Sequence, residues 1–259
     1  MTTSTNVTST NWSGAVIQAA SGKSLSTVSA VWKVPTVSQV PVRGVTTTDV
    51  ASWVGLDGYN SNDVCQAGIQ ETVTTGANGQ ASVSISAWDE WYPAGSNTIS
   101  SSAFKVDAGD TVRITVETTG AGATKATFLY DDETTGQTYQ TSLTAPHGTS
   151  LTGNSAEWVV ETPEWSNGFS AYQPLLADFL NTPIVFQDAS ASYANGSAAS
   201  LSGAMTIGME TSGGQGVPAY AQEAYGSVSA SADAVTVTED DYWANADTSS
   251  GPYGHHRYF

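Results

Sequence analysis

The stretch NSAEWVVET (residues 154–162) has the alternating pattern of a β-strand that is buried on one face. Successive side chains of a strand point to opposite faces. One face would carry three apolar side chains, those of Ala156, Trp158 and Val160. The other face would carry two carboxylates, Glu157 and Glu161, in a chain where charged residues make up only 12%. An acid within so apolar a strand needs a reason other than solubility.

The same kind of pattern runs along most of the chain. Alternating segments recur every 10–25 residues, with Gly, Asp, Asn and Ser turns between them. They lie at residues 13–20, 26–34, 50–57, 80–92, 110–118, 124–132, 137–143, 155–162, 182–189, 204–210 and 234–239. Many antiparallel strands with few helices are typical of a β-sandwich. The sequence therefore predicts an all-β fold, an antiparallel β-sandwich of two packed sheets.

We expect a single domain over residues 1–239, because no linker and no internal repeat interrupts the pattern. Residues 240–259 lack alternation and are predicted to form a surface tail. The segment SAYQPLLADFL (170–180) is the one helical candidate. It would be a short helix or a loop that drops apolar side chains onto the core. The segment DDETTGQ (131–137) predicts a hairpin turn in which Gly136 takes a positive φ.

Acidic residues greatly outnumber basic ones. The 259 residues include 24 Asp and Glu against 7 Lys and Arg, so the net charge is −17 at pH 7. Nucleic acid and anionic membrane are therefore poor candidate partners. With so few cations, few carboxylates can be held in ion pairs that acid would break, which favours a protein that works in acid. A secreted or halotolerant protein that is merely acidic would have the same composition.

The chain can form no internal disulfide, because Cys65 is its single cysteine. No apolar run approaches the ~18 residues of a membrane span. The first residues, MTTSTNVTSTN (1–11), are polar and lack the pattern of a signal peptide. We therefore expect the mature segment of a secreted protein, restarted with Met1.

Most familiar catalytic sets are excluded by residue type or position. A Ser-His-Asp triad needs a well-placed histidine, but His147 lies in a PHG turn, and His255 and His256 lie in the tail. Cys65 lies in the apolar run VCQAG and is interpreted as a small core residue rather than a nucleophile. There are too few ligands for zinc, and no phosphate-binding loop. Carboxylates and amides remain, and they suit chemistry in acid.

Several carboxylates lie beside large aromatic side chains in the sequence. They are Asp57 (in WVGLDG), Asp89 and Glu90 (in AWDEWYP), and Glu157 and Glu161 (in AEWVVE). An acid partly screened from water by aromatic rings can have its pKa moved towards a working value. The alternative for Asp57 is a cap of the turn before Gly58. For Asp89 it is a solvated surface position.

The tryptophans also have two interpretations. Trp32 (in VSAVWKVP) is predicted to lie in the core. Another five either fill the core too or line a groove for an extended ligand: Trp12, Trp53, Trp88, Trp91 and Trp158.

Seven short motifs then occur in a characteristic order along the chain. They are NWSGA (11–15), VSAVWKVP (28–35), SWVGLDG (52–58), QAG (66–68), AWDEWYP (87–93), GD (109–110) and AEWVVE (156–161). This ordered set resembles the glutamic peptidases, the eqolisins, over about residues 10–210. Fungal members of that family carry disulfides, which this chain cannot form, so the resemblance indicates a bacterial or otherwise divergent branch.

The resemblance implies a secreted acid endopeptidase with a β-sandwich fold, a Gln/Glu catalytic dyad and no metal or cofactor. The family glutamate matches Glu157, and the family glutamine matches Gln66. The groove residues of the family match Trp12, Trp53, Asp57, Glu90 and Glu161. The substrates would be polypeptides, and we expect a monomer.

The chemistry of peptide hydrolysis suits this dyad. A glutamate that holds a water within hydrogen-bond reach can accept its proton, and the protonated group can then give a proton to the leaving amine. Gln66 does not titrate, so in acid its carbonyl can still orient the water and its NH₂ can donate to the forming oxyanion. Strand packing would have to bring the two residues together. Whether Glu157 starts as base or as acid is left open.

Two other classes remain compatible with the residues themselves. A carbohydrate-binding or glycoside-hydrolysing β-sandwich would also combine an aromatic groove with paired carboxylates, such as Asp89 or Glu90 with Glu157. A glycosidase would not need Gln66. A structural surface protein would use the aromatic side chains only as core.

Overall fold

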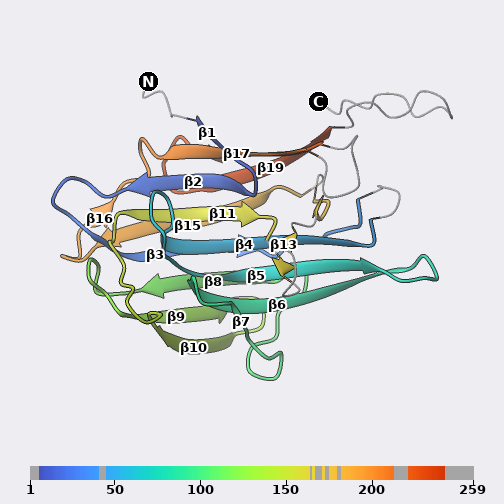
Figure 1. The fold of residues 1–259 in the computed structure, drawn as a ribbon, viewed down its shortest axis with the longest axis horizontal. Coiled ribbons are helices and arrows are strands. Elements are labelled where there is room, and N and C mark those ends of the chain that lie inside the picture. The colour runs from blue at the N-terminus through green and yellow to red at the C-terminus, as the bar shows by residue number, and fades with distance from the viewer. Residues whose placement is uncertain are drawn as a thin grey trace.

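The computed structural model describes residues 6–40, 45–163, 165–166, 171–172, 175–179, 182–212 and 221–242. Within these residues the chain consists of strands, turns and irregular segments. Figure 1 shows the strands running side by side across the molecule. No helix that is long and apolar enough to cross a membrane occurs in this part of the chain.

The strands form two sheets, of which the first, sheet A, contains the candidate site. Its central strands are, in order, β7 (Asn97–Thr98), β6 (Ala81–Tyr92), β5 (Val64–Thr75), β4 (Thr47–Asp57), β11 (Ser155–Glu161), β2 (Trp12–Gln18) and β17 (Met205–Ser212). β1 (Asn6–Ser9) pairs in parallel with β17, and the hairpin of β18 (Ala221–Val228) and β19 (Val235–Tyr242) extends it. The short strand β14 (Leu175–Leu176) runs parallel to β4 in this sheet, and β12 (Trp165–Ser166) and β13 (Ala171–Tyr172) form a separate two-stranded sheet.

Sheet B is the second layer. Its strands are, in order, β10 (Gln137–Thr144), β9 (Lys125–Asp132), β8 (Thr111–Glu117), β3 (Leu25–Lys33), β15 (Ile184–Tyr193) and β16 (Ala198–Ala199). β15 joins the two sheets, because its first residues pair with β19 and its later residues pair with β3. The change of partner comes at an irregular stretch that contains Asp188, whose φ is 49°. Such irregularities bend a strand, and here the bend lets one strand serve both layers.

The hydrophobic core lies between the two sheets. Its largest fully buried side chains include Trp32, Trp91, Trp158, Tyr130, Phe104, Phe128 and Phe186. A buried indole N–H or phenol O–H needs an acceptor, and three of these rings find one on the opposite sheet. The bonds run from Trp32 Nε1 to Ser52 Oγ (2.9 Å), from Tyr130 Oη to the Trp88 carbonyl (2.9 Å) and from Trp158 Nε1 to the Ser29 carbonyl (3.0 Å). Aromatic packing and these bonds together hold the layers in register.

The fold confirms the predicted all-β class, and each predicted strand segment overlaps an observed strand. In β11 the apolar residues face the core, as the alternation predicts. The hairpin of β9 and β10 is confirmed, with Gly136 at a φ of 77°. Two of the longer observed strands, β5 and β18, have no predicted counterpart, and neither do the short strands β1, β7, β12, β13, β14 and β16. The first half of β5, Val64–Ile69, is buried on both faces, which removes the alternation that marks a strand.

Two segments differ from the predictions. The helix alternative for residues 170–180 is wrong where the structure describes them, because Leu175–Leu176 form a strand beside β4. Leu176 and Phe179 are buried, as the loop alternative expects. The predicted tail begins too early, because residues 240–242 still belong to β19 and pair with β18. Residues 243–259, which include His255 and His256, lie outside the described residues.

Candidate active site

The outer face of sheet A carries the two predicted catalytic residues in one row. Glu157 of β11 stands opposite Gly55 of β4, and Gly55 stands opposite Gln66 of β5. Gln66 in turn stands opposite Glu90 of β6. Directly opposed side chains on neighbouring strands share a face of the sheet. The row therefore aligns a carboxyl group, a glycine, a carboxamide and a second carboxyl group across four strands.

Gly55 places no side chain between Glu157 and Gln66, and the ring of Trp53 lies where such a side chain would begin. Neighbouring strands lie about 4.8 Å apart, so the backbones of these two residues are roughly 10 Å apart across β4. A Cβ at position 55 would lie 3.3 Å from Gln66 Cβ and 2.9 Å from the ring of Trp53. Glycine at this position therefore adds no side chain of its own to the gap between the carboxyl group on one side and the carboxamide on the other.

Glu157 is fully buried although it lies on the outer face. Its Oε1 accepts a hydrogen bond from the backbone N–H of Tyr59 (3.4 Å), and its Oε2 has no hydrogen-bond partner in the described part of the chain. Burial raises the pKa of Glu157 well above its ordinary value, and the nearby charge of Asp57 raises it further. Contacts with Ser155 and the Tyr59 N–H lower this pKa only in part. The carboxyl group is therefore protonated in acid.

Gln66 is held by the next residue of the row. Its side chain is buried, and Nε2 donates to Glu90 Oε2 at 2.6 Å. Burial raises the pKa of Glu90, while this hydrogen bond lowers it. Gln66 Oε1 is buried and has no hydrogen-bond partner among the described residues. The hydrogen bond to Glu90 thus fixes the NH₂ group of the carboxamide, while its oxygen is left for a ligand.

An aromatic surface borders this row on the same face. Val159, Trp53 and Trp88 occupy the next outward-facing register position, with Gly68 between the two tryptophans. Trp12 packs edge-on against Trp53, with ring centroids 4.9 Å apart and planes at 80°. Trp12 is half-buried and Trp53 is fully buried in this outer-face cluster, and Trp32 lies in the core as predicted.

Glu161 is tied to the aromatic surface rather than to the row. Its Oε1 accepts from Asn11 Nδ2 (2.9 Å), and its Oε2 accepts from Trp53 Nε1 (2.8 Å). Burial raises the pKa of Glu161 to about 7, and the nearby charge of Glu90 adds to the increase. The indole and amide donors lower this pKa in part. Glu161 therefore carries a proton throughout the acid range and orients the Trp53 ring.

Asp57 lies at the end of β4, where its carboxylate is held by hydrogen bonds. Its side chain is fully buried, and its carboxylate accepts bonds from a loop distant in the sequence: Thr152 N (2.5 Å), Thr152 Oγ1 (3.0 Å), Gly153 N (3.2 Å) and Asn154 N (2.8 Å). The loop that it holds leads directly into β11. We therefore interpret Asp57 as a residue that positions Glu157, in place of the substrate contact and the turn cap that the sequence suggests.

Asp57→Ala is expected to lower the free energy of unfolding by about 3 kcal/mol or more, because buried donors lose their acceptor. Urea denaturation at pH 5 would measure this change. The control is Glu117→Ala on the exposed surface of β8, for which we expect a change within about 0.5 kcal/mol. A loss below about 1 kcal/mol for Asp57→Ala would show that the loop does not depend on this carboxylate.

Asp89 is buried, so its interpretation as a solvated residue is wrong. It points to the core side of β6, where its Oδ1 accepts from Asn97 Nδ2 at 3.0 Å. Burial raises its pKa, and the bond to Asn97 lowers it. Cys65 lies in the core as predicted, and burial raises the pKa of its thiol well above the ordinary value. Neither residue reaches the row on the outer face.

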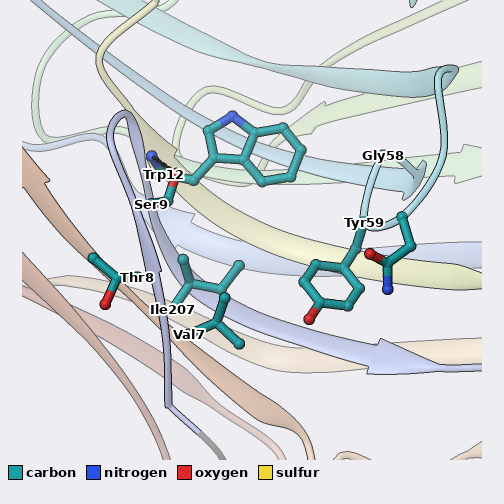
Figure 2. Close-up of a pocket in the computed structure, with 8 residues that line it drawn as sticks. Val7, Thr8, Ser9, Trp12, Gly58, Tyr59 and Ile207 are labelled. Atoms are coloured by element: carbon teal, nitrogen blue, oxygen red, sulfur yellow. Dashed lines mark hydrogen bonds between the residues drawn. The ribbon is translucent and has the colours of Figure 1, made fainter.

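Three residues of the site were not predicted from the sequence. Gly55 adds no side chain to the gap, Tyr59 donates its backbone N–H to Glu157, and Asn11 donates to Glu161. Figure 2 shows Tyr59 and Trp12 on the walls of one cavity beside this site. Asn11 and Gly55 lie within the motifs NWSGA and SWVGLDG, so their place in those motifs was the available signal.

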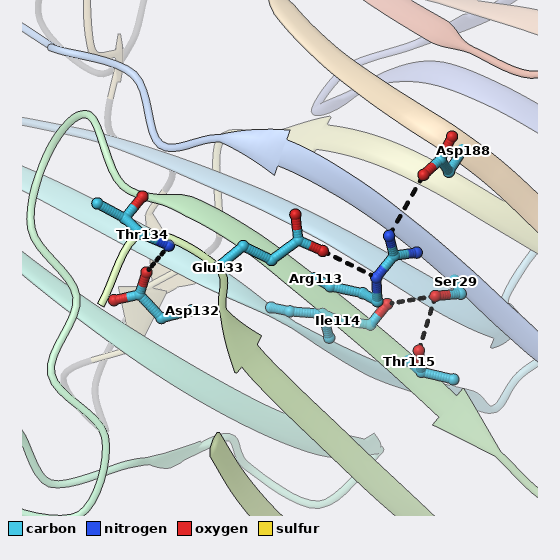
Figure 3. Close-up of polar contacts among 8 residues, drawn as sticks. All are labelled: Ser29, Arg113, Ile114, Thr115, Asp132, Glu133, Thr134 and Asp188. Carbon is cyan, nitrogen blue, oxygen red and sulfur yellow. Dashed lines mark hydrogen bonds and ion pairs between the residues drawn. The ribbon is translucent and has the colours of Figure 1, made fainter. Parts of the chain in front are cut away.

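The outer face of sheet B carries a different arrangement. Arg113 pairs with Glu133 (3.1 Å) and with Asp188 (3.3 Å), and these side chains are partly or largely exposed (Figure 3). Lys105 and Asp107 form a further ion pair on the surface. Exposed pairs contribute little to stability. Protonation of carboxylates in acid would therefore break few stabilising ion pairs among the described residues, as the composition predicts.

The row on sheet A places a proton donor, the carboxyl group of Glu157, across from an uncharged polar group, the carboxamide of Gln66. In the described residues no group of three His, Cys, Asp or Glu side chains is placed to hold a metal ion. A carboxyl group that is protonated in acid can exchange protons with a bound molecule. A carboxamide across the gap can donate and accept hydrogen bonds without changing charge.

Comparisons with known proteins show the family to which the chain belongs. The model of the Peptidase A4 family matches residues 10–239. Scytalidopepsin B from Scytalidium lignicola is 32% identical over 157 residues, which are 61% of this chain and 53% of that protein. Aspergillopepsin-2 from Aspergillus niger is 30% identical over 188 residues, which are 73% of this chain and 58% of that protein. The chain thus spans little more than half the length of these two relatives.

This chain also matches a solved structure over almost the entire length of that structure. It is scytalido-glutamic peptidase with a transition state analog inhibitor, which is 25% identical with a TM-score of 0.68, over 88% of this chain and 98% of that chain. The family match covers most of the chain, and it includes every strand from β2 to β18. The chain therefore belongs to the Peptidase A4 family, the glutamic peptidases that its ordered motifs resemble.

Proposed function

We propose that this protein is a secreted, monomeric acid endopeptidase that hydrolyses polypeptides with Glu157 and Gln66 as its catalytic dyad. The observation that carries the proposal is the row in which Gly55 separates a buried carboxyl group from a buried carboxamide. Each side of the gap presents an oxygen that has no hydrogen-bond partner among the described residues, Glu157 Oε2 and Gln66 Oε1. Such groups are rare in folded proteins and call for a ligand.

Glu157 would begin the reaction as an acid. Its raised pKa means that it holds a proton at low pH, which supports the choice that the sequence left open. It would give this proton to the carbonyl oxygen of the scissile bond while its second oxygen accepts a proton from the attacking water. The result is a neutral tetrahedral intermediate, and Glu157 stays protonated. The same group can then protonate the leaving amine as the C–N bond breaks. It takes a proton back from one of the two hydroxyl groups of the intermediate, which leaves a carboxylic acid.

Gln66 would hold the water and the reacting oxygen in place. Its Oε1 can accept a hydrogen bond from the water, and the N–H that does not bind Glu90 can donate to the carbonyl oxygen. Because the amide does not titrate, this function persists at a pH where a carboxylate would be neutralised. The hydrogen bond to Glu90 (2.6 Å) keeps the carboxamide in one orientation.

The aromatic surface would bind the substrate as an extended chain. Trp12, which is half-buried, offers apolar contact area next to the row, and it packs against the fully buried Trp53, whose ring Glu161 keeps in place. Glu90 contributes through Gln66, and Asp57 through the loop that precedes β11. An apolar floor with few polar groups is typical of sites that bind ligands of this kind. The likeness to scytalido-glutamic peptidase, whose structure was solved with a transition state analog inhibitor, supports a peptidase function here.

The spacing of the carboxyl groups argues against a glycosidase. The backbones of Glu90 and Glu157 are separated by three strand spacings, roughly 14 Å. The two carboxyl groups of a glycosidase lie about 5–9.5 Å apart. The residue that faces Glu157 across the gap is moreover an amide, which a glycosidase mechanism does not use.

Hydrolysis of a denatured protein is expected to be fastest below about pH 5 and to fall as the pH rises. The sign follows from the raised pKa of Glu157: the active, protonated form exists below that pKa and is lost above it. The rate should fall about tenfold per pH unit once this proton is lost. The measurement is the release of new amino groups between pH 2 and 7, with circular dichroism at each pH to follow the fold.

A panel of glycans assayed under the same conditions is the control for the alternative function. Peptide cleavage in acid without release of sugar supports the proposal. Folded protein that cleaves no peptide at any pH would overturn it, and sugar release would favour the glycosidase.

A further inference from the structure

One carboxyl group lies in the hydrophobic core of the sandwich, away from the proposed catalytic row. Glu71 of β5 is fully buried, and neither of its two oxygens has a hydrogen-bond partner in the described part of the chain. Buried polar groups without partners are rare in folded proteins, and each one calls for an explanation. The proposed reaction takes place on the other face of the sheet and does not use this residue.

Strand register places Glu71 among aliphatic side chains. It lies between Ile69 and Val73 on the inner face of β5, and both of these residues belong to the core. Across the sheet it stands opposite Val50 of β4 and Ile85 of β6, which lie in the core or pack against it. Side chains that alternate along a strand or oppose each other on neighbouring strands share a face. The carboxyl group of Glu71 is therefore surrounded across the sheet by apolar neighbours.

The neighbouring strands of sheet A bring only acids towards Glu71. On β4, Asp49 is one residue from the position opposite Glu71, while Asp57 lies at the far end of the strand. On β6, Asp89 and Glu90 stand opposite residues four and five positions before Glu71, at least about 13 Å away along the strand. A negative charge on Glu71 would thus be repelled by its nearest charged neighbour.

The strand of sheet B that packs against β5 supplies no cation to Glu71. Buried apolar residues alternate with polar ones along β8, so Arg113 and Glu117 point away from the core. Arg113 pairs with Glu133 and Asp188 on the outer face of sheet B. Among the residues of β4, β6 and β8, Glu71 therefore has no positive group that could stabilise its ionised form.

This environment makes the stability of the fold depend on pH. Burial raises the pKa of Glu71 well above its ordinary value of about 4.5, and the charge of Asp49 raises it further. Because the folded pKa is higher than the unfolded one, the contribution of the uncharged carboxyl group is complete below about pH 4.5 and is lost as the pH rises through the folded pKa. Over this interval the ratio of folded to unfolded protein falls about tenfold per pH unit.

The sheet around Glu71 is suited to local opening. Residues Ala81–Ser86 of β6 pair with β5 on one edge, whereas the described strand on the other edge, β7, pairs only with Trp88 and Asp89. The side chains of Ala81–Ser86 are exposed or half-buried. Figure 1 shows the turn between β5 and β6 projecting beyond the neighbouring strands. Segments with little buried surface and a solvent-exposed edge open at a lower free energy than the whole fold.

We propose that Glu71 is a pH switch built into the fold: in acid its uncharged side chain packs in the core, and its ionisation towards neutral pH opens the outer half of the β5–β6 hairpin, residues 70–86. The inference does not depend on the proposed peptidase function. Opening would also loosen the proposed active site, because Gln66 and Glu90 lie on the same two strands.

The first test is thermal unfolding of the full chain at pH 3 and at pH 7, for wild type, Glu71→Gln and Glu71→Leu. Wild type is expected to have a lower Tm at pH 7 than at pH 3. Each variant should make this difference smaller by at least about 5 °C, because neither side chain ionises. Two variants are used because glutamine leaves its amide unpaired in the core whereas leucine does not, and only the change of Tm with pH is compared.

Hydrogen exchange followed by mass spectrometry locates the change. At pH 7, peptides from residues 70–86 should exchange about tenfold faster or more in wild type than in Glu71→Leu, while peptides from β8 and β9 should exchange equally in both. At pH 3 the two proteins should not differ in the hairpin. The matched control is Glu117→Gln, which removes an exposed carboxylate from β8 and should behave as wild type in both experiments.

Two results would overturn the inference. One is that the folded Glu71 variants keep the wild-type difference in Tm between the two pH values, which would show that Glu71 has no part in the pH dependence. The other is equal exchange of the hairpin in wild type and Glu71→Leu at pH 7, which would show that ionisation does not open it. Neither result bears on peptide cleavage at pH 4, which both Glu71 variants should retain within about twofold of wild type.

Discussion

Glu157→Gln is expected to lower kcat/KM for a denatured protein substrate at pH 4 by about 10²–10⁴-fold, the contribution typical of a general acid–base. Glutamine has nearly the shape of the protonated glutamic acid that burial favours at this position. It cannot give or take the proton of a carboxyl group. The variant should therefore fold normally in acid while the proton transfers to the carbonyl oxygen and to the amine are lost. Initial rates of substrate cleavage, measured with circular dichroism, would check this result.

The same variant has a second signature in its stability. A carboxyl group whose folded pKa is raised above its unfolded value stabilises the protein below the unfolded pKa, about 4.5, and this contribution is lost as the pH rises through the folded pKa. Glutamine does not ionise, so Glu157→Gln should be more stable than wild type at pH 7 and similar to it at pH 3. Thermal unfolding at both pH values would measure the difference.

The control for both measurements is Glu117→Gln, an exposed glutamate of β8 on the other sheet. It should change neither the rate nor the pH dependence of stability. If folded Glu157→Gln retains more than about half of the wild-type rate, Glu157 is not the proton donor, and another carboxyl group of the outer face must act in its place.

Gln66→Ala is expected to lower kcat/KM by about 10²–10³-fold, the loss typical for one donor of an oxyanion site. The substitution removes the amide that would orient the water and contact the carbonyl oxygen. It also removes the donor that lowers the pKa of Glu90, so the pKa of Glu90 should rise in the variant. The rate loss should appear in kcat more than in KM, because the amide aligns the water and the carbonyl oxygen chiefly in the transition state, in which the proton transfers occur.

Gln70→Ala provides a matched control on the same strand. Gln70 lies on the same face of β5 as Gln66, and its Nε2 donates to Asp49 (2.8 Å) rather than to a residue of the row. We expect its kcat/KM to stay within severalfold of wild type. Equal losses for the two variants would show that any disturbance of β5 reduces the rate, and would remove the specific function proposed for Gln66.

Periodicity along the sequence indicated the face of the strand on which a side chain lies, but not the contacts that the side chain makes there. Alternation in β11 predicts that Glu157 and Glu161 lie on a face opposite the core, and the structure has that arrangement. Asp57 is the counterexample. Its position in a groove motif suggests contact with substrate, but its four hydrogen bonds go to residues about 95 positions later in the chain. No local pattern indicates an acceptor so distant from its donors.

The strand that carries Gln66 shows a second limit. β5 is buried on both faces over Val64–Ile69, so its sequence contains no alternation. Its place in the sheet is evident only from its partners, β4 and β6. The ordered motifs singled out Gln66 where periodicity did not, since a motif reflects the site rather than the local burial pattern.

The sequence by itself determined the all-β class, most strands, the outward face of Glu157 and the motifs of the glutamic peptidases. These follow from a period of two along a strand and from short runs of residues, both of which are local properties of the chain. The tertiary structure decided the row with Gly55, the raised pKa of Glu157, the buried position of Asp57 and the cavity between β1, β17 and the loop after β4. Proximity and loss of hydration depend on which distant strands pack together, and that is a property of the whole fold.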